Sequence, residues 1–127
     1  MSMNAIEVIT LFADDIVATK AFYKKVFAAE VLFEDDVSAV FQFAGVMINL
    51  LKASEAPELV TPAPVGTATS GARMMLTIRV EDVNATYADL QGRGVSFLNG
   101  PIDRSWGRRT ATFADPAGHA WEIAQEI

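Results

Sequence analysis

The sequence contains an internal repeat at an offset of 67 residues, and this repeat constrains the fold more than any other feature. Matching segments at a fixed offset are typical of a duplicated supersecondary unit. The paired positions are Asp15 and Asp82, Ile16 and Val83, Ala18 and Ala85, Thr19 and Thr86, and Ala21 and Ala88. A Phe-Ala-Gly pattern also recurs near the end of each copy, with three residues inserted in the second. We therefore expect two copies of one unit.

The first copy predicts the element order strand, helix, strand, strand, strand. Residues 7–13 alternate in the manner of a strand with two partly buried faces. Asp14 and Asp15 then offer N-caps to a helix, because a short acidic side chain accepts hydrogen bonds from free backbone N–H groups. The apolar positions at helical spacing are Ala18, Ala21, Phe22 and Val26. Three β-rich runs follow at residues 31–33, 40–43 and 46–51, and the acidic residues 34–36 predict a solvated turn.

The second copy repeats this order from residue 74. An alternating strand runs to residue 80, and Glu81-Asp82 begins a helix that ends at Gly92-Arg93-Gly94. The apolar residues of this helix recur at i, i+4 and i+7: Val83, Tyr87 and Leu90. Further strand candidates lie at residues 95–98, 110–113 and 119–124. The prolines and glycines of residues 53–72 predict an irregular crossover between the copies.

The composition disfavours several classes of function. The 127 residues include no cysteine, which removes thiol nucleophiles and thiolate metal ligands. Sixteen acidic residues against ten basic ones give a formal net charge of −6, which disfavours a nucleic-acid backbone as partner. No apolar run approaches the ~20 residues that span a bilayer. We therefore expect a cytoplasmic protein that binds neither nucleic acid nor membrane.

Five motifs carry a resemblance to a known family. They are residues 14–16 (Asp-Asp-Ile), 22–23 (Phe-Tyr), 80–83 (Val-Glu-Asp-Val), 106–109 (Trp-Gly-Arg-Arg) and 115–123 (Asp-Pro-Ala-Gly-His-Ala-Trp-Glu-Ile). Together they resemble the vicinal oxygen chelate family of glyoxalases, extradiol dioxygenases and bleomycin-resistance proteins. The resemblance covers nearly the whole chain, and the last block is its most specific part.

The resemblance implies an α+β fold, in which two tandem βαβββ modules form a curved, barrel-like mixed sheet around a cavity. Residues 1–127 then form one domain, with module one at about 5–52, the crossover at about 53–72 and module two at about 73–127. Members of the family commonly dimerise, so a homodimer is expected. Many members hold a divalent metal in the cavity.

The resemblance also locates four positions where the family keeps metal ligands, one on the first and one on the last strand of each module. In this sequence they are Val8, Asn49, Met75 and Glu122. Only Glu122 is a strong ligand, whereas a catalytic zinc, nickel or iron centre takes about three histidine or carboxylate ligands. The single histidine, His119, lies three residues before Glu122 and is predicted to point to the opposite face. We expect no metal and no other cofactor.

Seven residues are candidates for contact with a small-molecule ligand. Glu122 is interpreted either as a ligand-binding carboxylate or as half of a structural ion pair with Arg79. Trp106 can stack on a flat ligand and a nearby arginine can bind a carboxylate or phosphate, or these side chains can be simply solvated. Arg104, Arg108 and Arg109 are all candidates for the arginine role. The full set is Phe12, Asn49, Met75, Arg79, Trp106, Arg109 and Glu122.

Three functions remain open at this point. The first is a glyoxalase/bleomycin-resistance-like protein that holds a small organic ligand, such as a cationic or aromatic one, in the cavity between modules without a metal and without catalysis. The second is a metal-dependent lyase or dioxygenase of the same family with an atypical metal site. The third is a non-catalytic dimeric scaffold whose cavity is filled.

Overall fold

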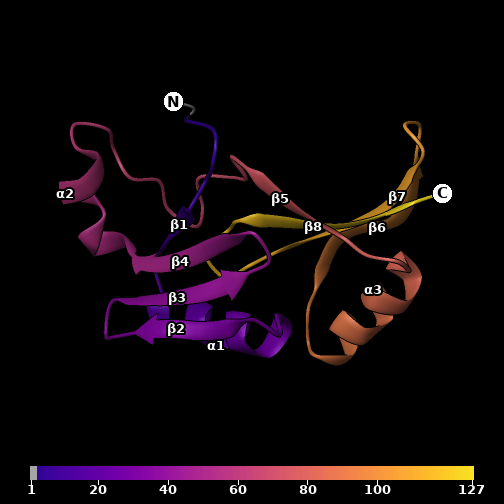
Figure 1. Ribbon diagram of the computed structural model, residues 1–127, viewed down its shortest axis with the longest axis horizontal. Coiled ribbons are helices and arrows are strands. Elements are labelled where there is room, and N and C mark those ends of the chain that lie inside the picture. Colours follow the sequence, from indigo (N-terminus) through magenta and orange to yellow (C-terminus); the bar gives the residue numbers. More distant parts are fainter. Residues whose placement is uncertain (1–2) are drawn as a thin grey trace. The chain divides into compact units, whose positions relative to one another are not determined.

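The computed structural model describes residues 3–127 and separates into two compact units, one ending at Thr69 and the other beginning at Ser70. The first contains β1 (Val8–Ala13), α1 (Ile16–Val26), β2 (Glu30–Glu34), β3 (Ser38–Phe43) and β4 (Val46–Lys52). The second contains β5 (Met75–Arg79), α3 (Val83–Gly92), β6 (Phe97–Arg104), β7 (Arg108–Ala114) and β8 (Ala120–Glu126). Figure 1 labels these elements. Each copy of the repeat forms the predicted βαβββ unit.

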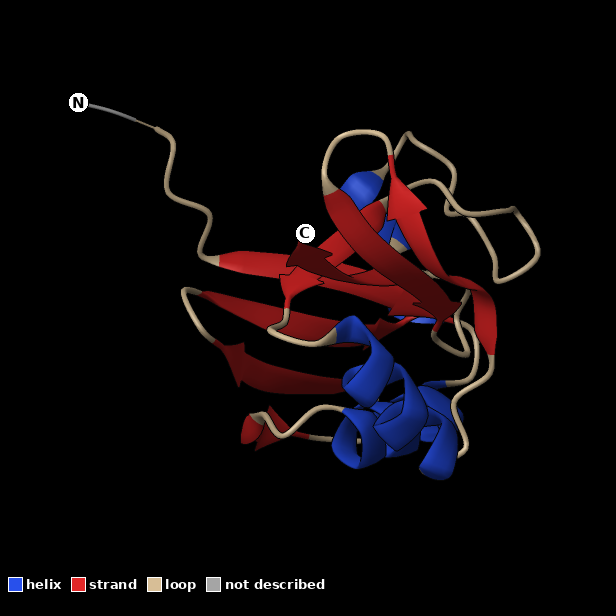
Figure 2. Cartoon of the chain, turned by 90° about the vertical axis from the view of Figure 1, so that its right-hand side faces the viewer, coloured by secondary structure: helices blue, strands red, loops and turns tan. Residues whose placement is uncertain are grey.

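Each unit builds one four-stranded mixed sheet, and the strand order is the same in both. The orders are β1-β4-β3-β2 and β5-β8-β7-β6. The first and last strands of a unit pair in parallel, and the other neighbours are antiparallel. Figure 2 shows the strands of the sheets as twisted ribbons. The predicted α+β class with two tandem mixed-sheet modules is confirmed.

The two main helices begin with the same cap, which explains why the repeat is clearest there. The carboxylate of Asp15 accepts a hydrogen bond from the backbone N–H of Ala18 at 3.0 Å. The carboxylate of Asp82 accepts one from Ala85, also at 3.0 Å. Both aspartates have extended backbone angles, as an N-cap requires. The matched aspartates therefore define the start of each helix.

The buried face of α1 differs from the predicted one. Its buried residues are Ile16, Thr19, Tyr23 and Val26. Of the predicted set, only Val26 is buried, and Ala21 is exposed. The Tyr23 ring packs against the sheet, with its centroid 5.9 Å from that of Phe41 on β3. The larger side chains bury more apolar area and set the helix rotation.

The core of the second unit follows the sequence pattern more closely. Val83 and Leu90 on α3 are buried, as predicted. Tyr87 is half-buried, with its ring 4.4 Å from that of Phe97 on β6. Phe113 and Trp121 complete the apolar layer on the same side of the sheet. The helix therefore covers one face of the sheet and leaves the other without a helix.

Strand β6 is longer than the predicted strand at residues 95–98, because it continues past Pro101 to Arg104. The pairing of β6 with β7 shifts register between Phe97 and Asn99 and again between Asn99 and Ile102. Such irregularities let a strand accommodate proline, which has no backbone N–H to donate. Gly100 lies within the second irregularity at a φ of +99°.

The crossover is more ordered than the sequence predicts. It contains the 3-10 helix η1 (Ala53–Glu55) and the short helix α2 (Pro57–Val60). The backbone N–H of Ala68 also donates to the carboxylate of Asp14 at 2.8 Å, which ties the crossover to the start of α1. Proline at the first helical position explains how a proline-containing segment forms α2. Within residues 3–127, no helix is long and apolar enough to cross a membrane.

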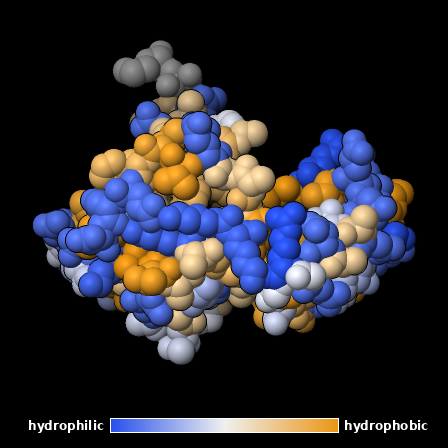
Figure 3. All heavy atoms as spheres, turned by 90° about the horizontal axis from the view of Figure 1, so that it is seen from below, coloured by the Kyte–Doolittle hydropathy of each residue, from blue (hydrophilic) through white to orange (hydrophobic). Residues whose placement is uncertain are grey.

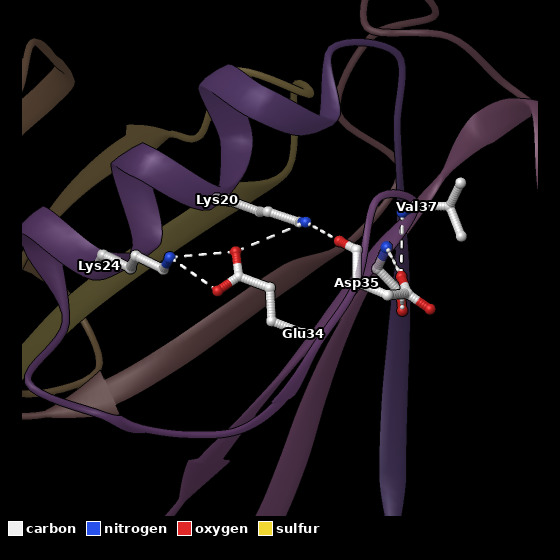
Figure 4. A network of polar contacts seen from close by, with 6 residues as sticks. Lys20, Lys24, Glu34, Asp35 and Val37 are labelled. Carbon is white, nitrogen blue, oxygen red and sulfur yellow. Dashed lines mark hydrogen bonds and ion pairs between the residues drawn. The ribbon is translucent and has the colours of Figure 1, made fainter.

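The acidic turn between β2 and β3 is exposed, as predicted, but two of its carboxylates have specific partners (Figure 4). Glu34 accepts from Lys24 at 2.9 Å and lies 3.5 Å from the Lys20 ammonium, which also donates to the Asp35 carbonyl. The hydrogen bond from Lys24 lowers the pKa of Glu34. The Asp35 carboxylate accepts from the backbone N–H of Val37, which lowers its pKa. The network joins α1 to the β2–β3 turn.

Hydrophobic side chains also reach the surface. Orange patches break the hydrophilic surface in Figure 3. On the edge strand β2, the consecutive residues Val31, Leu32 and Phe33 are all exposed.

We predict that Gly100→Ala destabilises the fold more than Gly45→Ala does. Both glycines have a positive φ, which costs an alanine about 1 kcal/mol. A Cβ at Gly100 would also lie 2.5 Å from the Cα of Ala111, whereas one at Gly45 meets nothing within 4 Å. We expect Gly100→Ala to lower the free energy of unfolding, measured in urea, by at least ~2 kcal/mol more than Gly45→Ala does, which is the usual cost of overpacking. Equal losses for the two variants would contradict this account.

We also predict that Glu34→Gln weakens the dependence of stability on acid. Because the folded-state pKa of Glu34 is lowered, its charge stabilises the fold above its ordinary pKa, and this stabilisation is lost as pH falls through the folded-state value. Between pH 6 and pH 3, the free energy of unfolding in urea should fall less for Glu34→Gln than for the unmodified protein. For the control Glu58→Gln, in α2, the free energy of unfolding should fall with pH as much as for the unmodified protein. A Glu34 variant with an unchanged pH profile would refute the prediction.

Candidate functional site

The candidate site lies on the helix-free face of the second sheet. Strand register aligns four polar side chains in one row across this face. Thr77 on β5 pairs with Glu122 on β8, Glu122 pairs with Thr112 on β7, and Thr112 pairs with Asn99 on β6. Asn99 belongs to this row because the register shift after Phe97 moves it to the other face from that residue.

Glu122 is half-buried and is held by a neutral donor. The Thr77 hydroxyl donates to Oε1 of Glu122 at 3.0 Å. Among residues 3–127, Glu122 forms no ion pair. The predicted pair with Arg79 is absent from this part of the chain, because Arg79 aligns with Ala124 and bonds to Glu126 at 3.5 Å. No cationic side chain of residues 3–127 therefore pairs with the Glu122 carboxylate.

The first unit carries the equivalent pair one repeat earlier. Thr10 on β1 aligns with Asn49 on β4, and the Asn49 amide donates to the Thr10 hydroxyl at 3.4 Å. The Oδ1 atom of Asn49 is buried and has no hydrogen-bond partner in the described structure. A buried acceptor without a donor costs free energy unless water or a ligand satisfies it. The repeat has thus kept a threonine beside a carbonyl or carboxylate in both units.

The family metal positions do not fit a metal centre. Val8 and Met75 are exposed apolar side chains without a ligating oxygen or nitrogen. That leaves the Glu122 carboxylate and the Asn49 amide, fewer and weaker donors than a zinc, nickel or iron site uses. In the described part of the chain, no group of three or more His, Asp or Glu side chains is arranged to hold a metal ion.

Arg109 lies on the opposite face of the second sheet from Glu122. It aligns with Asp103 on β6 and with Gln125 on β8. Its Nε donates to the Asp103 carboxylate at 2.7 Å. This hydrogen bond lowers the pKa of Asp103 and raises that of Arg109 above its ordinary value. The structure therefore does not bring Arg109 and Glu122 together.

Trp106 is also separated from Glu122. It is 67% exposed in the turn between β6 and β7. It precedes Thr112, the partner of Glu122, by six residues, which is roughly 20 Å along an extended strand. The other tryptophan, Trp121, is 2% exposed. Contact between Trp106 and a ligand stays a prediction.

Phe12 and Met75 lie on the helix-free faces of their own sheets. Phe12 aligns with Leu51 and is half-buried, whereas Met75 aligns with Ala120 and is 51% exposed. His119 lies just before β8, where its Nδ1 is 2.9 Å from a carboxylate oxygen of the buried Asp115. It serves the turn between β7 and β8.

Arg104 belongs to the Glu122 face, and the sequence prediction chose Arg109 instead. Arg104 aligns with Arg108, which aligns with Glu126 on the face of Glu122. Its Nε donates to the hydroxyl of the buried Thr110 at 3.0 Å, and its Nη2 donates to the side-chain Oδ1 of Asn99 at 3.5 Å. The sequence held a signal for this choice, because a three-residue hairpin loop ending in Gly107 pairs residue 104 with residue 108.

A pocket of about 420 Å³ lies at another place on the second unit. It is lined by Arg79, Val80, Glu81, Gln125 and Glu126. Arg79 and Glu126 bond to each other there, and Gln125 accepts from the first N–H of α3. The polar groups are thus largely occupied, and the Glu122 row is the stronger candidate site.

A model of the Glyoxalase/Bleomycin resistance protein/Dioxygenase superfamily matches residues 5–123. The chain belongs to this superfamily. The predicted family is therefore confirmed.

Two curated relatives show how widely the superfamily varies. Over 121 residues, the chain is 33% identical to the uncharacterized protein YraH of Bacillus subtilis (strain 168). The matched region covers 91% of this chain and 93% of YraH. It is 26% identical over 121 residues to the metallothiol transferase FosB of Staphylococcus saprophyticus, covering 95% of this chain and 76% of the transferase.

Two solved structures share the fold over the whole chain. A glyoxalase/bleomycin resistance protein/dioxygenase from Nocardioides has a TM-score of 0.88 at 25% identity, covering 100% of this chain and 86% of that one. TnmS3, an antibiotic binding protein from Streptomyces sp. CB03234, has a TM-score of 0.73 at 25% identity, covering 100% and 99%.

Proposed function

We propose that the protein reversibly binds a small organic ligand, without a metal and without breaking a bond, and that Glu122 binds a cationic group of this ligand. The observation that carries the proposal is the Glu122 carboxylate itself. It is half-buried, held by the Thr77 hydroxyl at 3.0 Å, and not neutralised by a cation in residues 3–127. A partly desolvated carboxylate forms stronger charge-assisted hydrogen bonds than a solvated one.

The Thr77 hydroxyl leaves room for such a ligand. A carboxylate accepts about four hydrogen bonds through its two oxygens, and Thr77 occupies one position on Oε1. A ligand ammonium or protonated amine can then donate to Oε2. Thr77 fixes the orientation of the carboxylate without reducing its charge, which is the arrangement a cation-binding site needs.

Two comparisons bear on the choice between binding and metal-dependent catalysis. An antibiotic binding protein among the structural relatives supports ligand sequestration. The metallothiol transferase among the curated relatives supports a metal-dependent enzyme, the alternative function. The donor set favours the first, because two of the four family ligand positions are Val8 and Met75.

We predict that Glu122→Gln weakens the binding of a cationic aromatic antibiotic by about 10-fold or more. Loss of a hydrogen bond to a charged group costs ~1.5–3 kcal/mol, and 1.4 kcal/mol is a factor of 10 in affinity. Isothermal titration calorimetry with bleomycin and a panel of cationic aromatic antibiotics measures the effect. Glu126→Gln is the matched control, since it removes the same charge from the same strand and face where Arg79 and Arg108 already pair with it. Equal effects of the two substitutions would argue against the proposed role of Glu122.

The metal-free part of the proposal needs a separate measurement. Elemental analysis of the purified protein, together with a thermal-shift screen with Ni²⁺, Zn²⁺, Mn²⁺ and Fe²⁺, should show no stoichiometric metal and no selective stabilisation. A stoichiometric metal that is lost in Glu122→Ala would overturn the proposal in favour of the enzyme.

A further inference from the structure

We propose that Arg104 forms the anion-binding half of the Glu122 site, so that the ligand carries a cationic and an anionic group held several ångströms apart. This inference rests on the proposed function and adds the charge pattern of the ligand to it. The chemical class is a zwitterion of the ω-amino carboxylate type.

Arg104 and Glu122 lie on the same face with one strand between them. Glu122 is on β8, Arg104 is on β6, and β7 separates them in the sheet order. Neighbouring strands are about 4.8 Å apart, so the two strands lie roughly 10 Å apart. Arg104 aligns with Arg108 and Glu126, so its backbone also lies four residues, roughly 14 Å, along the sheet from the row of Glu122. Thr112 on β7 stands in the same row as Glu122. The neighbour of Thr112 on β6 is Asn99, so the Arg104 side chain must extend back along the sheet to approach this row.

The Arg104 guanidinium reaches back toward that row. Its Nε donates to the Thr110 hydroxyl at 3.0 Å, and its Nη2 donates to the side-chain Oδ1 of Asn99 at 3.5 Å. Asn99 aligns with Thr112 in the row of Glu122. Both acceptors are neutral, so they orient the guanidinium and leave its charge uncompensated. A guanidinium has five N–H donors, and the remaining ones suit the two oxygens of a carboxylate.

Four of the five other arginines of the described chain have their charge matched by a carboxylate, and Arg73 is the exception. The four are Arg79 and Arg108, which pair with Glu126, Arg93, which pairs with Asp89, and Arg109, which pairs with Asp103. Arg104 and Glu122 take part in no ion pair within residues 3–127, including one with each other. Two opposite charges on one face, each held by neutral groups and too far apart to neutralise one another, are the complement of a zwitterion.

The separation decides which zwitterion fits. Each hydrogen bond to the ligand spans about 2.9 Å, so bridging strands ~10 Å apart requires ligand charges several ångströms apart. The ammonium and carboxylate of glycine are adjacent and cannot reach both residues. 6-Aminohexanoate has five methylenes between its charged groups and can span them.

The test compares 6-aminohexanoate with hexylamine, hexanoate and glycine, using the full chain and NMR titration or calorimetry. Hexylamine and hexanoate keep one charge each. We expect 6-aminohexanoate to bind at least about tenfold more tightly than any of the other three, since each charge-assisted contact contributes ~1.5 kcal/mol or more. Equal affinity for hexylamine and 6-aminohexanoate would overturn the inference.

Substitutions assign each half of the site. Arg104→Gln should lower the affinity for 6-aminohexanoate and hexanoate about tenfold and leave the affinity for hexylamine unchanged. Glu122→Gln should lower the affinity for 6-aminohexanoate and hexylamine and leave the affinity for hexanoate unchanged. Arg93→Gln and Glu126→Gln are the charge-matched controls and should leave all affinities unchanged. Arg104→Lys keeps the charge without the bond pattern and should retain part of the preference for a carboxylate, which guards against a folding defect in Arg104→Gln.

The outcomes separate this inference from the proposed function. If hexylamine binding depends on Glu122 but Arg104→Gln leaves 6-aminohexanoate unchanged, Arg104 is excluded and cation binding at Glu122 stands. If 6-aminohexanoate binding depends on neither residue, or is undetectable, the inference is wrong. In that case bleomycin and the antibiotic panel still decide the proposed function.

Discussion

The parallel pairing of the first and last strands within each unit is the constraint on which the rest of the structure depends. It brings residues from opposite ends of the repeat side by side, Thr10 beside Asn49 and Thr77 beside Glu122. The helix and two strands between them must then cross over the sheet, which places the helix on one face only. The opposite face is free to carry polar groups.

Each sheet therefore has two faces with different tasks. The helix-covered face holds the large apolar side chains, such as Tyr23 and Phe41 in one unit and Phe113 and Trp121 in the other. Their burial stabilises each unit through the hydrophobic effect. In the second unit, the helix-free face carries Glu122, which has no cationic partner within residues 3–127.

The charges of the second unit are distributed by this division. Arg109 and Asp103 neutralise each other on the helix-covered side, and Arg79 and Arg108 share Glu126 at the end of β8. Glu122 and Arg104 are held instead by neutral groups, namely threonine hydroxyls and a side-chain amide. This arrangement suits reversible recognition of a charged small molecule, and it does not supply the ligand set of a metal enzyme.

The sequence by itself determined the duplication, the element order, the aspartate caps and the superfamily, because these depend on local hydrogen bonding and on patterns that persist along the chain. It also predicted Glu122 as a ligand contact, which stays a prediction. Only the tertiary structure decided which side chains share its face. Two register shifts in β6 bring Asn99 and Arg104 together on the Glu122 side. The pairing of Arg79 with Glu126 follows from strand register too, and a shift of one residue moves a side chain to the other face of a sheet.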